Sequence, residues 1–153
     1  MKDGWPTVLV LNGPNLARLG KRDSLVYGVG TYSELETICW EVGAEFGMAV
    51  DVRQTEDEAE MLRWLHEAAD REIPVVLNAG AWSHYSYALR DAVAEVKAPV
   101  IEVHLSQTAA REEFRHHSVI SAVATGTITG LKVDSYRLAL WAVARLVRQG
   151  GSS

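Results

Sequence analysis

The feature of this sequence that most constrains its fold is a regular alternation between short apolar runs and amphipathic stretches. The apolar runs span four to seven residues and are mostly rich in Val, Ile and Leu, which is typical of buried parallel strands. In the intervening stretches apolar residues recur with a helical period, which predicts helices that cover a sheet. The predicted strands are 7–11, 48–52, 74–77, 99–103 and 125–131, and the predicted helices are 31–46, 57–70, 84–96 and 135–148.

This alternation predicts an α/β fold in which helices cover both faces of a parallel sheet. Five strands in a chain of 153 residues favour the flavodoxin-like arrangement, with strand order 2-1-3-4-5. We expect a single domain over 1–149 and a flexible tail at 150–153. The stretch 16–30 has no apolar period and is predicted to be a long mobile loop, which ends where Thr31 and Glu34 can form a capping box.

Composition narrows the class of protein. The formal net charge is −5 and the Lys and Arg residues are scattered, so a nucleic-acid partner is not expected. No apolar run approaches the ~20 residues of a membrane span and no apolar signal region follows Met1, so we expect a cytoplasmic protein with no membrane partner. Cys39 is the single cysteine and falls on the apolar face of a predicted helix, which indicates a structural thiol.

Polar residues follow several of the predicted strands. The segment 12–15 (Asn-Gly-Pro-Asn) follows the first strand, 78–80 (Asn-Ala-Gly) and His84 follow the third, and His104 and Ser106 follow the fourth. In the predicted order these strands are neighbours, and ligands of such sheets bind beyond the carboxyl ends of the strands, where the order reverses. The sequence therefore predicts one site for a small, oxygen-rich anion at this edge of the sheet.

Each of these residues also has an ordinary structural interpretation. Asn-Gly-Pro is common in turns, so Asn15 could simply shape a turn. His104 could be a satisfied structural histidine, Tyr27 a half-buried loop aromatic and Arg22 part of the surface. No two histidines have the helical spacing of a metalloprotease and no Cys-x-x-Cys is present, so no metal site is expected.

Several short motifs, taken together and in order, resemble those of one enzyme family. They are Asn-Gly-Pro-Asn-Leu at 12–16, Arg22, Val-Tyr-Gly at 26–28, Arg53-Gln54, Asn-Ala-Gly at 78–80, Ser83-His84, Glu-Val-His-Leu-Ser at 102–106, Arg111-Glu112 and Phe-Arg-His-His-Ser at 114–118. This set resembles the type II 3-dehydroquinate dehydratases, and it extends from the first predicted strand to the last predicted helix. Each motif alone is weak, and their common order makes the resemblance specific.

The resemblance implies anti elimination of water from 3-dehydroquinate through an enolate, in the shikimate or quinate pathway, without cofactor or metal. Tyr27 would remove the proton beside the ketone. Arg22 would favour its phenolate, since a free tyrosine, with a pKa of about 10, is mostly protonated at neutral pH. His104 would protonate the departing hydroxyl, and Glu102 would orient the imidazole. Asn15 would hold a water against the developing enolate.

The same resemblance implies the contacts to the small-molecule substrate. Backbone N–H groups of Leu105 and Ser106, with Asn78 beside them, would bind the substrate carboxylate. Arg115 and His84 would bind ring hydroxyls. Asp91 would reach the active site of a neighbouring subunit, so a homo-oligomer of trimers grouped into a dodecamer is implied.

The sequence also departs from the family pattern. Tyr85 and Tyr87 replace small residues, Gln107 replaces an Asn, and 132–135 (Lys-Val-Asp-Ser) replaces a stretch that contains Gly. The two tyrosines could narrow the wall of the site or change a subunit contact. These departures leave open a re-purposed or non-catalytic paralogue that binds a related cyclic hydroxy acid. A flavodoxin-like nucleotide- or flavin-binding protein is a weaker alternative, because the loop after the first strand lacks both a Walker lysine and G-x-G-x-x-G.

Overall fold

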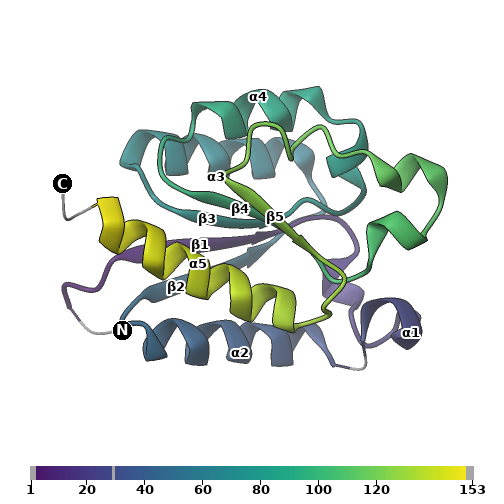
Figure 1. The fold of residues 1–153 in the computed structure, drawn as a ribbon, viewed down its shortest axis with the longest axis horizontal. Helices are drawn as coiled ribbons and strands as arrows, with labels where there is room; N and C mark the ends of the chain where they lie inside the picture. The colour runs from purple at the N-terminus through teal and green to yellow at the C-terminus, as the bar shows by residue number, and fades with distance from the viewer. Residues whose placement is uncertain (1–2, 29, 151–153) are drawn as a thin grey trace.

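The computed structural model describes residues 3–28 and 30–150, and it shows a five-stranded parallel sheet with helices on both faces (Figure 1). The strand order is β2-β1-β3-β4-β5, so the predicted fold class and strand order are confirmed. The strands are β1 (Thr7–Asn12), β2 (Ala49–Gln54), β3 (Val75–Asn78), β4 (Val100–His104) and β5 (Gly126–Thr129). The long helices are α2 (Tyr32–Glu45) and α5 (Asp134–Gly150) on one face, and α3 (Glu58–Arg71) and α4 (Tyr87–Glu95) on the other.

Strand β1 shows why the strands are apolar on both faces. Successive side chains of a strand point to opposite faces. Val8 and Val10 belong to the core under α2 and α5, whereas Leu9 and Leu11 belong to the core under α3 and α4. Each such side chain contributes about 1.5–3 kcal/mol when fully buried. Cys39 is fully buried in the first of these cores, and burial raises the pKa of its thiol to about 12, as expected for a structural cysteine.

Side-chain caps fix where the helices begin. The capping box before α2 forms as predicted, with Thr31 and Glu34 each accepting a hydrogen bond from the other's backbone N–H. The prediction that a helix starts at residue 84 was wrong. Residues Gly80–His84 form a separate 3-10 turn (η2), and α4 starts only after Ser86, whose hydroxyl accepts from the backbone N–H of Leu89.

The segment 16–30 is not the unbroken loop that its composition predicts. It contains a 3-10 turn, η1 (Leu16–Arg18), and a short helix, α1 (Ser24–Tyr27), that begins because the Asp23 carboxylate accepts from the backbone N–H of Leu25. The connection from β4 to β5 carries two further 3-10 turns, η3 (Thr108–Ala110) and η4 (Glu113–His116). Helix α5 extends to Gly150, one residue into the predicted tail, and the rest of that tail lies outside the described residues.

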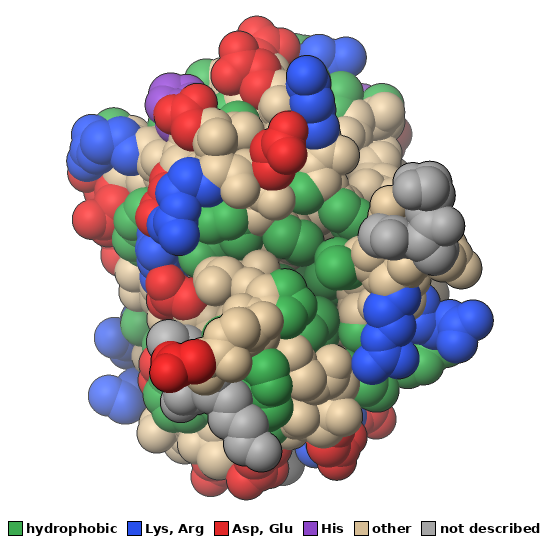
Figure 2. Space-filling view, turned by 90° about the vertical axis from the view of Figure 1, so that its left-hand side faces the viewer, with side chains coloured by type: hydrophobic (Ala, Val, Ile, Leu, Met, Phe, Trp, Pro, Cys, Tyr) green, Lys and Arg blue, Asp and Glu red, His purple; other side chains and the backbone are tan. Residues whose placement is uncertain are grey.

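The two ends of the sheet differ in chemistry. At the amino ends of the strands, apolar side chains form a broad surface patch between charged groups (Figure 2), and a groove there is lined by Pro6, Ile73, Pro74, Pro99 and Val147, among others. Histidine and tyrosine side chains gather instead at the carboxyl ends. Among the residues that the structure describes, no helix is both long and apolar enough to cross a membrane.

Candidate active site

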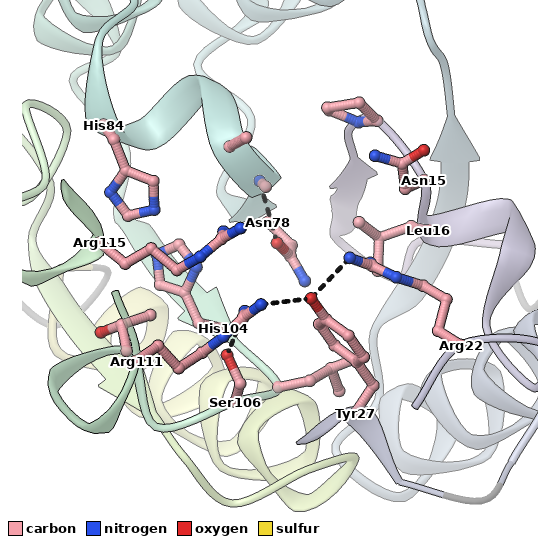
Figure 3. A pocket seen from close by; sticks show the side chains of 15 residues that line it. Asn15, Leu16, Arg22, Tyr27, Asn78, His84, His104, Ser106, Arg111 and Arg115 are labelled. Carbon is pink, nitrogen blue, oxygen red and sulfur yellow. Dashed lines mark hydrogen bonds between the residues drawn. The ribbon is translucent and has the colours of Figure 1, made fainter. Parts of the chain in front are cut away.

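A pocket lies beyond the carboxyl ends of β1, β3 and β4 (Figure 3). The loops after these strands supply its walls, and α1 closes one side. Every predicted site residue except Glu102 and Asp91 lines it. The lining residues are Pro14, Asn15, Leu16, Arg22, Tyr27, Asn78, Gly80, Ala81, His84, His104, Leu105, Ser106, Thr108, Arg111 and Arg115.

Two arginines hold the Tyr27 hydroxyl in the pocket. Arg22 Nη2 lies 2.6 Å from the Tyr27 oxygen, and Arg111 Nη2 lies 2.7 Å from the same atom. The Arg22 guanidinium also lies over the phenol ring, with its central carbon 3.7 Å from the ring centroid. Two cationic donors on one oxygen stabilise negative charge there. The Tyr27 oxygen therefore lies between two cations at the pocket.

Sequence reasoning assigned no role to Arg111. It lies 84 residues from Tyr27 and its Nη1 donates to Ser106 Oγ at 3.1 Å, so it joins the loop after β4 to α1. The available signal was that Arg111 belongs to the Arg111-Glu112 motif, five residues after Ser106. Only the turn formed by η3 brings it back toward the pocket.

His104 is fixed from behind by Glu102. Glu102 is 0% exposed, and one of its oxygens lies 2.7 Å from His104 Nε2. Since a carboxylate accepts hydrogen bonds, Nε2 carries the proton of this bond. The bond leaves Nδ1 as the ring nitrogen available to a ligand. Both residues belong to β4, two positions apart and therefore on one face of the sheet. This arrangement leaves His104 able to exchange a proton with a ligand in the pocket.

Three hydroxyl groups complete the surroundings of Glu102. Ser118 Oγ donates to the carboxylate at 2.7 Å, Thr127 Oγ1 donates at 3.3 Å, and Ser121 Oγ donates as well. Burial by itself would raise the pKa of Glu102, but the hydrogen bonds from His104 and Ser121 outweigh it, so the pKa is lowered. Glu102 is therefore a buried anion. Ser118 ends the 114–118 motif but had no role assigned to it, and no local pattern pointed to Ser121 or Thr127, which lie 19 and 25 residues downstream.

His84 stacks beside His104 and is held in one tautomer. The ring centroids are 6.2 Å apart and the rings are 18° from parallel. His84 Nδ1 lies 2.9 Å from the carbonyl oxygen of His117, which can only accept, so Nδ1 carries the proton. Burial lowers the pKa of His84 despite this hydrogen bond, which favours the neutral ring. Its Nε2 is then an acceptor, suited to a hydroxyl group of a ligand.

Asn78 is anchored by a buried network. Asn78 Nδ2 donates to the Tyr136 hydroxyl at 2.8 Å, and that hydroxyl donates to Asn12 Oδ1 at 2.6 Å. The backbone N–H of Gly80 donates to Asn78 Oδ1 at 3.2 Å. Asn15, on the opposite wall, has a left-handed backbone (φ 70°), and its N–H donates to the Glu56 carboxylate. The side-chain amide of Asn78 and the backbone of Asn15 are thus set by the fold before any ligand arrives.

The pocket is positively charged in an acidic protein. Arg22, Arg111 and Arg115 line it together with two histidines, and no Asp or Glu is among the described residues that do so. Outside the pocket, Glu112 lies 3.1 Å from Arg115 Nε and holds that side chain. Local donors therefore favour an anionic ligand, although the formal net charge is −5. Within residues 3–28 and 30–150, no three His, Cys, Asp or Glu side chains group as metal ligands would.

Two sequence expectations involve residues that lie outside the pocket. Asp91, on α4, is 78% exposed in its side chain and pairs with Arg90 at 3.3 Å. Tyr85 and Tyr87 are 60% and 69% exposed and do not line the pocket, so within one subunit they do not narrow its wall, and their effect on a subunit contact stays a prediction. The backbone turn of η2 directs His84 inward while both tyrosines face outward.

Comparison with known proteins agrees with this geometry. A family model described as "Dehydroquinase class II" matches residues 6–144. The chain is 61% identical over 141 residues to a "3-dehydroquinate dehydratase" of Salinispora tropica, covering 92% of this chain and 99% of the relative. It is 54% identical to the enzyme of that name from Mycobacterium tuberculosis, covering 87% of this chain and 90% of the relative. The crystal structure of the type II dehydroquinase from Propionibacterium acnes superposes with a TM-score of 0.89 at 54% identity, covering 91% of this chain and 96% of that one. The chain belongs to the class II dehydroquinase family.

Proposed function

We infer that this protein is a 3-dehydroquinate dehydratase, a hydro-lyase that converts 3-dehydroquinate into 3-dehydroshikimate. The observation that carries the inference is the pairing of a cation-bound phenol, Tyr27, with a carboxylate-backed imidazole, His104, across one anion-binding pocket. Relatives of 54–61% identity bear the name of this enzyme. The role fits the synthesis of aromatic amino acids.

We propose that Tyr27 starts the reaction as the base. Its phenolate oxygen takes the proton from the carbon beside the ketone, and the electron pair moves onto the carbonyl oxygen as an enolate. Arg22 and Arg111 stabilise the phenolate before this transfer. Asn15 orients a water molecule that donates to the enolate oxygen, so that negative charge is stabilised where it develops.

His104 completes the elimination as the acid. The enolate electrons re-form the carbonyl and a carbon–carbon double bond, and the bond to the leaving hydroxyl breaks as His104 gives it a proton. Glu102 stabilises the cationic imidazole from the buried side. The products are water and a conjugated enone. Neither step requires a cofactor or a metal ion.

The remaining pocket residues orient the substrate. The loop at Leu105 and Ser106, with Asn78, binds the carboxylate, and His84 and Arg115 bind the ring hydroxyls. His84 supports this role because its unprotonated Nε2 can accept from a hydroxyl group.

The direct test follows the conjugated enone in the ultraviolet after 3-dehydroquinate is added. We expect turnover with a chelator present, and no inactivation by borohydride in the presence of substrate, because no lysine Schiff base forms. Tyr27→Phe should lose most of kcat yet bind a product-like ligand as before. Tyr87→Phe, which removes an exposed hydroxyl outside the pocket, is the matched control. Wild-type turnover by Tyr27→Phe would remove Tyr27 from the mechanism.

We further propose a cytoplasmic homo-oligomer of single-domain subunits, in which Asp91 completes a neighbour's pocket and trimers assemble into a dodecamer. The support is that Asp91 faces outward from α4, away from its own pocket. Asp91→Ala should reduce activity, whereas Arg90→Ala breaks the same surface ion pair and should not. Light scattering on the active protein tests the assembly, and a fully active monomer would contradict it.

A further inference from the structure

Helix α1 carries Tyr27 but is poorly anchored by apolar contacts. None of its four residues is buried, and Leu25 is 86% exposed. Tyr27 is its one residue that packs against the core, and only as a half-buried side chain. Polar contacts must therefore contribute much of the stabilisation that holds α1 at the mouth of the pocket.

One of these contacts comes from Lys132, in the turn between β5 and α5. Lys132 Nζ lies 2.8 Å from the carbonyl oxygen of Leu25 and 2.8 Å from that of Val26. Both carbonyls belong to the final turn of α1, where backbone acceptors lack helical partners. A cation at the carboxyl end of a helix is favourable for that reason and because of the helix dipole.

The aliphatic part of Lys132 follows the same path. A methyl group added at Gly28, the residue that ends α1, would lie 3.6 Å from Lys132 Cβ and 3.8 Å from its Cδ. The lysine chain thus runs past Gly28 before its ammonium group reaches α1. The contact with α1 therefore depends on both the length of the lysine side chain and its positive charge.

The backbone of Lys132 is fixed to the pocket. Its N–H donates to the carbonyl oxygen of Leu105 at 2.9 Å, and Leu105 lines the pocket beside His104. Lys132 also holds a left-handed conformation, with φ 55°, which costs a non-glycine residue about 1–2 kcal/mol. Glycine would adopt this conformation without that cost, so the side chain present here needs a reason in its contacts.

We propose that Lys132 is a positioning residue for catalysis. It ties α1 to the loop that carries His104 and so holds Tyr27 toward the pocket, acting through α1 without touching the substrate. The inference rests on the proposed function of Tyr27. It predicts that loss of the ammonium group releases α1 and lowers turnover, while the buried core stays intact.

Two substitutions separate this role from a structural one. Lys132→Met keeps most of the chain and removes the charge. Lys132→Gly removes the contact and also relieves the left-handed backbone, so its melting temperature should equal or exceed that of the wild type. Both should lower the single-turnover rate by about three- to tenfold, since a partly exposed charged hydrogen bond is lost. Lys132→Arg should recover part of the rate, and Lys97→Met, an exposed lysine at the amino edge of the sheet, should match the wild type.

Hydrogen exchange of the backbone amides of residues 24–28 measures how firmly α1 is held, independently of activity. We expect faster exchange in Lys132→Met and Lys132→Gly, with the core strands unchanged. Wild-type exchange and a wild-type single-turnover rate in Lys132→Gly would overturn the proposal. A wild-type rate in Tyr27→Phe would instead remove the proposed function, and the exchange result would still show whether Lys132 holds α1.

Discussion

Replacing Glu102 with Gln tests the proposed acid most directly. Glu102 is fully buried and accepts from His104, Ser118, Ser121 and Thr127. Gln has nearly the same size, and its amide oxygen can still accept from His104. The substitution therefore removes the negative charge behind the imidazole and leaves the shape of the site largely unchanged.

The structure sets the scale of the expected loss. A hydrogen bond to a charged group contributes about 1.5–3 kcal/mol, and two unit charges about 4 Å apart interact by about 4 kcal/mol at an effective dielectric constant near 20. The lost stabilisation of a cationic His104 is thus about 1.5–4 kcal/mol. Since each 1.36 kcal/mol changes a rate tenfold, kcat should fall by about 10- to 1000-fold. KM should change little, because Glu102 does not line the pocket.

The assay is steady-state formation of the enone from 3-dehydroquinate, with kcat and KM measured separately. Thr127→Val is the matched control, because it removes the longest of the hydroxyl bonds to the carboxylate, at 3.3 Å, together with a 3.3 Å contact to Ser121, and keeps the charge. Its kcat should stay within about threefold of the wild type, because the carboxylate keeps its charge and its three shorter donors, and so long a contact contributes only about 0.5 kcal/mol. A Gln variant whose kcat also stayed within threefold would show that the charge of Glu102 is not needed.

Three other predictions concern stability and the second arginine. Tyr136→Phe leaves two buried amides short of a partner, so the protein should lose about 2–4 kcal/mol and melt roughly 5–15 °C lower, whereas Tyr87→Phe should melt as the wild type. Burial raises the pKa of Cys39 to about 12, so the folded state keeps a thiol proton that the unfolded state loses above about pH 9. The free energy of unfolding, measured with denaturant, should therefore fall as pH rises from about 9 to 12, and less steeply in Cys39→Ala. Arg111→Met should lower kcat by about 10- to 100-fold because one charged donor to Tyr27 is lost, and an unchanged kcat would leave Arg22 as the sole partner that matters.

The sequence predicted the sheet well because its signals are local. Short, mostly apolar runs identified the strands, and the capping box at Thr31 located the start of α2. Errors arose where a polar contact decides the conformation. Ser86 delays α4 until Tyr87 by capping it, and the Asp23 carboxylate creates α1 inside a stretch without apolar period.

The site was less predictable than the sheet, because its contacts join distant segments. His104 and Glu102 are two residues apart on one strand, so their pairing follows from the strand period alone. The contact of Arg111 with Tyr27 spans 84 residues and that of Lys132 with Val26 spans 106. Neither follows from composition or periodicity, because both depend on how the connections between strands and helices return to the pocket.

The proposed acid, His104, and the proposed base, Tyr27, differ in how firmly the fold holds them. His104 is part of β4, is 7% exposed, and is backed by a carboxylate that four donors hold in place. Tyr27 lies on a helix without buried residues, and its hydroxyl accepts from two arginine side chains, Arg22 of the same segment and Arg111 of the loop after β4. The proposed acid is therefore fixed before substrate arrives, whereas we expect the contacts of the proposed base to break and re-form as substrate enters and product leaves. Arg22, Arg111 and Lys132 control the base, so substitutions that weaken them should slow proton removal, while substitutions around Glu102 should slow departure of the hydroxyl. A primary deuterium isotope effect at the abstracted position should accordingly rise in Arg111→Met and shrink in Glu102→Gln, and equal effects in the two variants would contradict this assignment of roles.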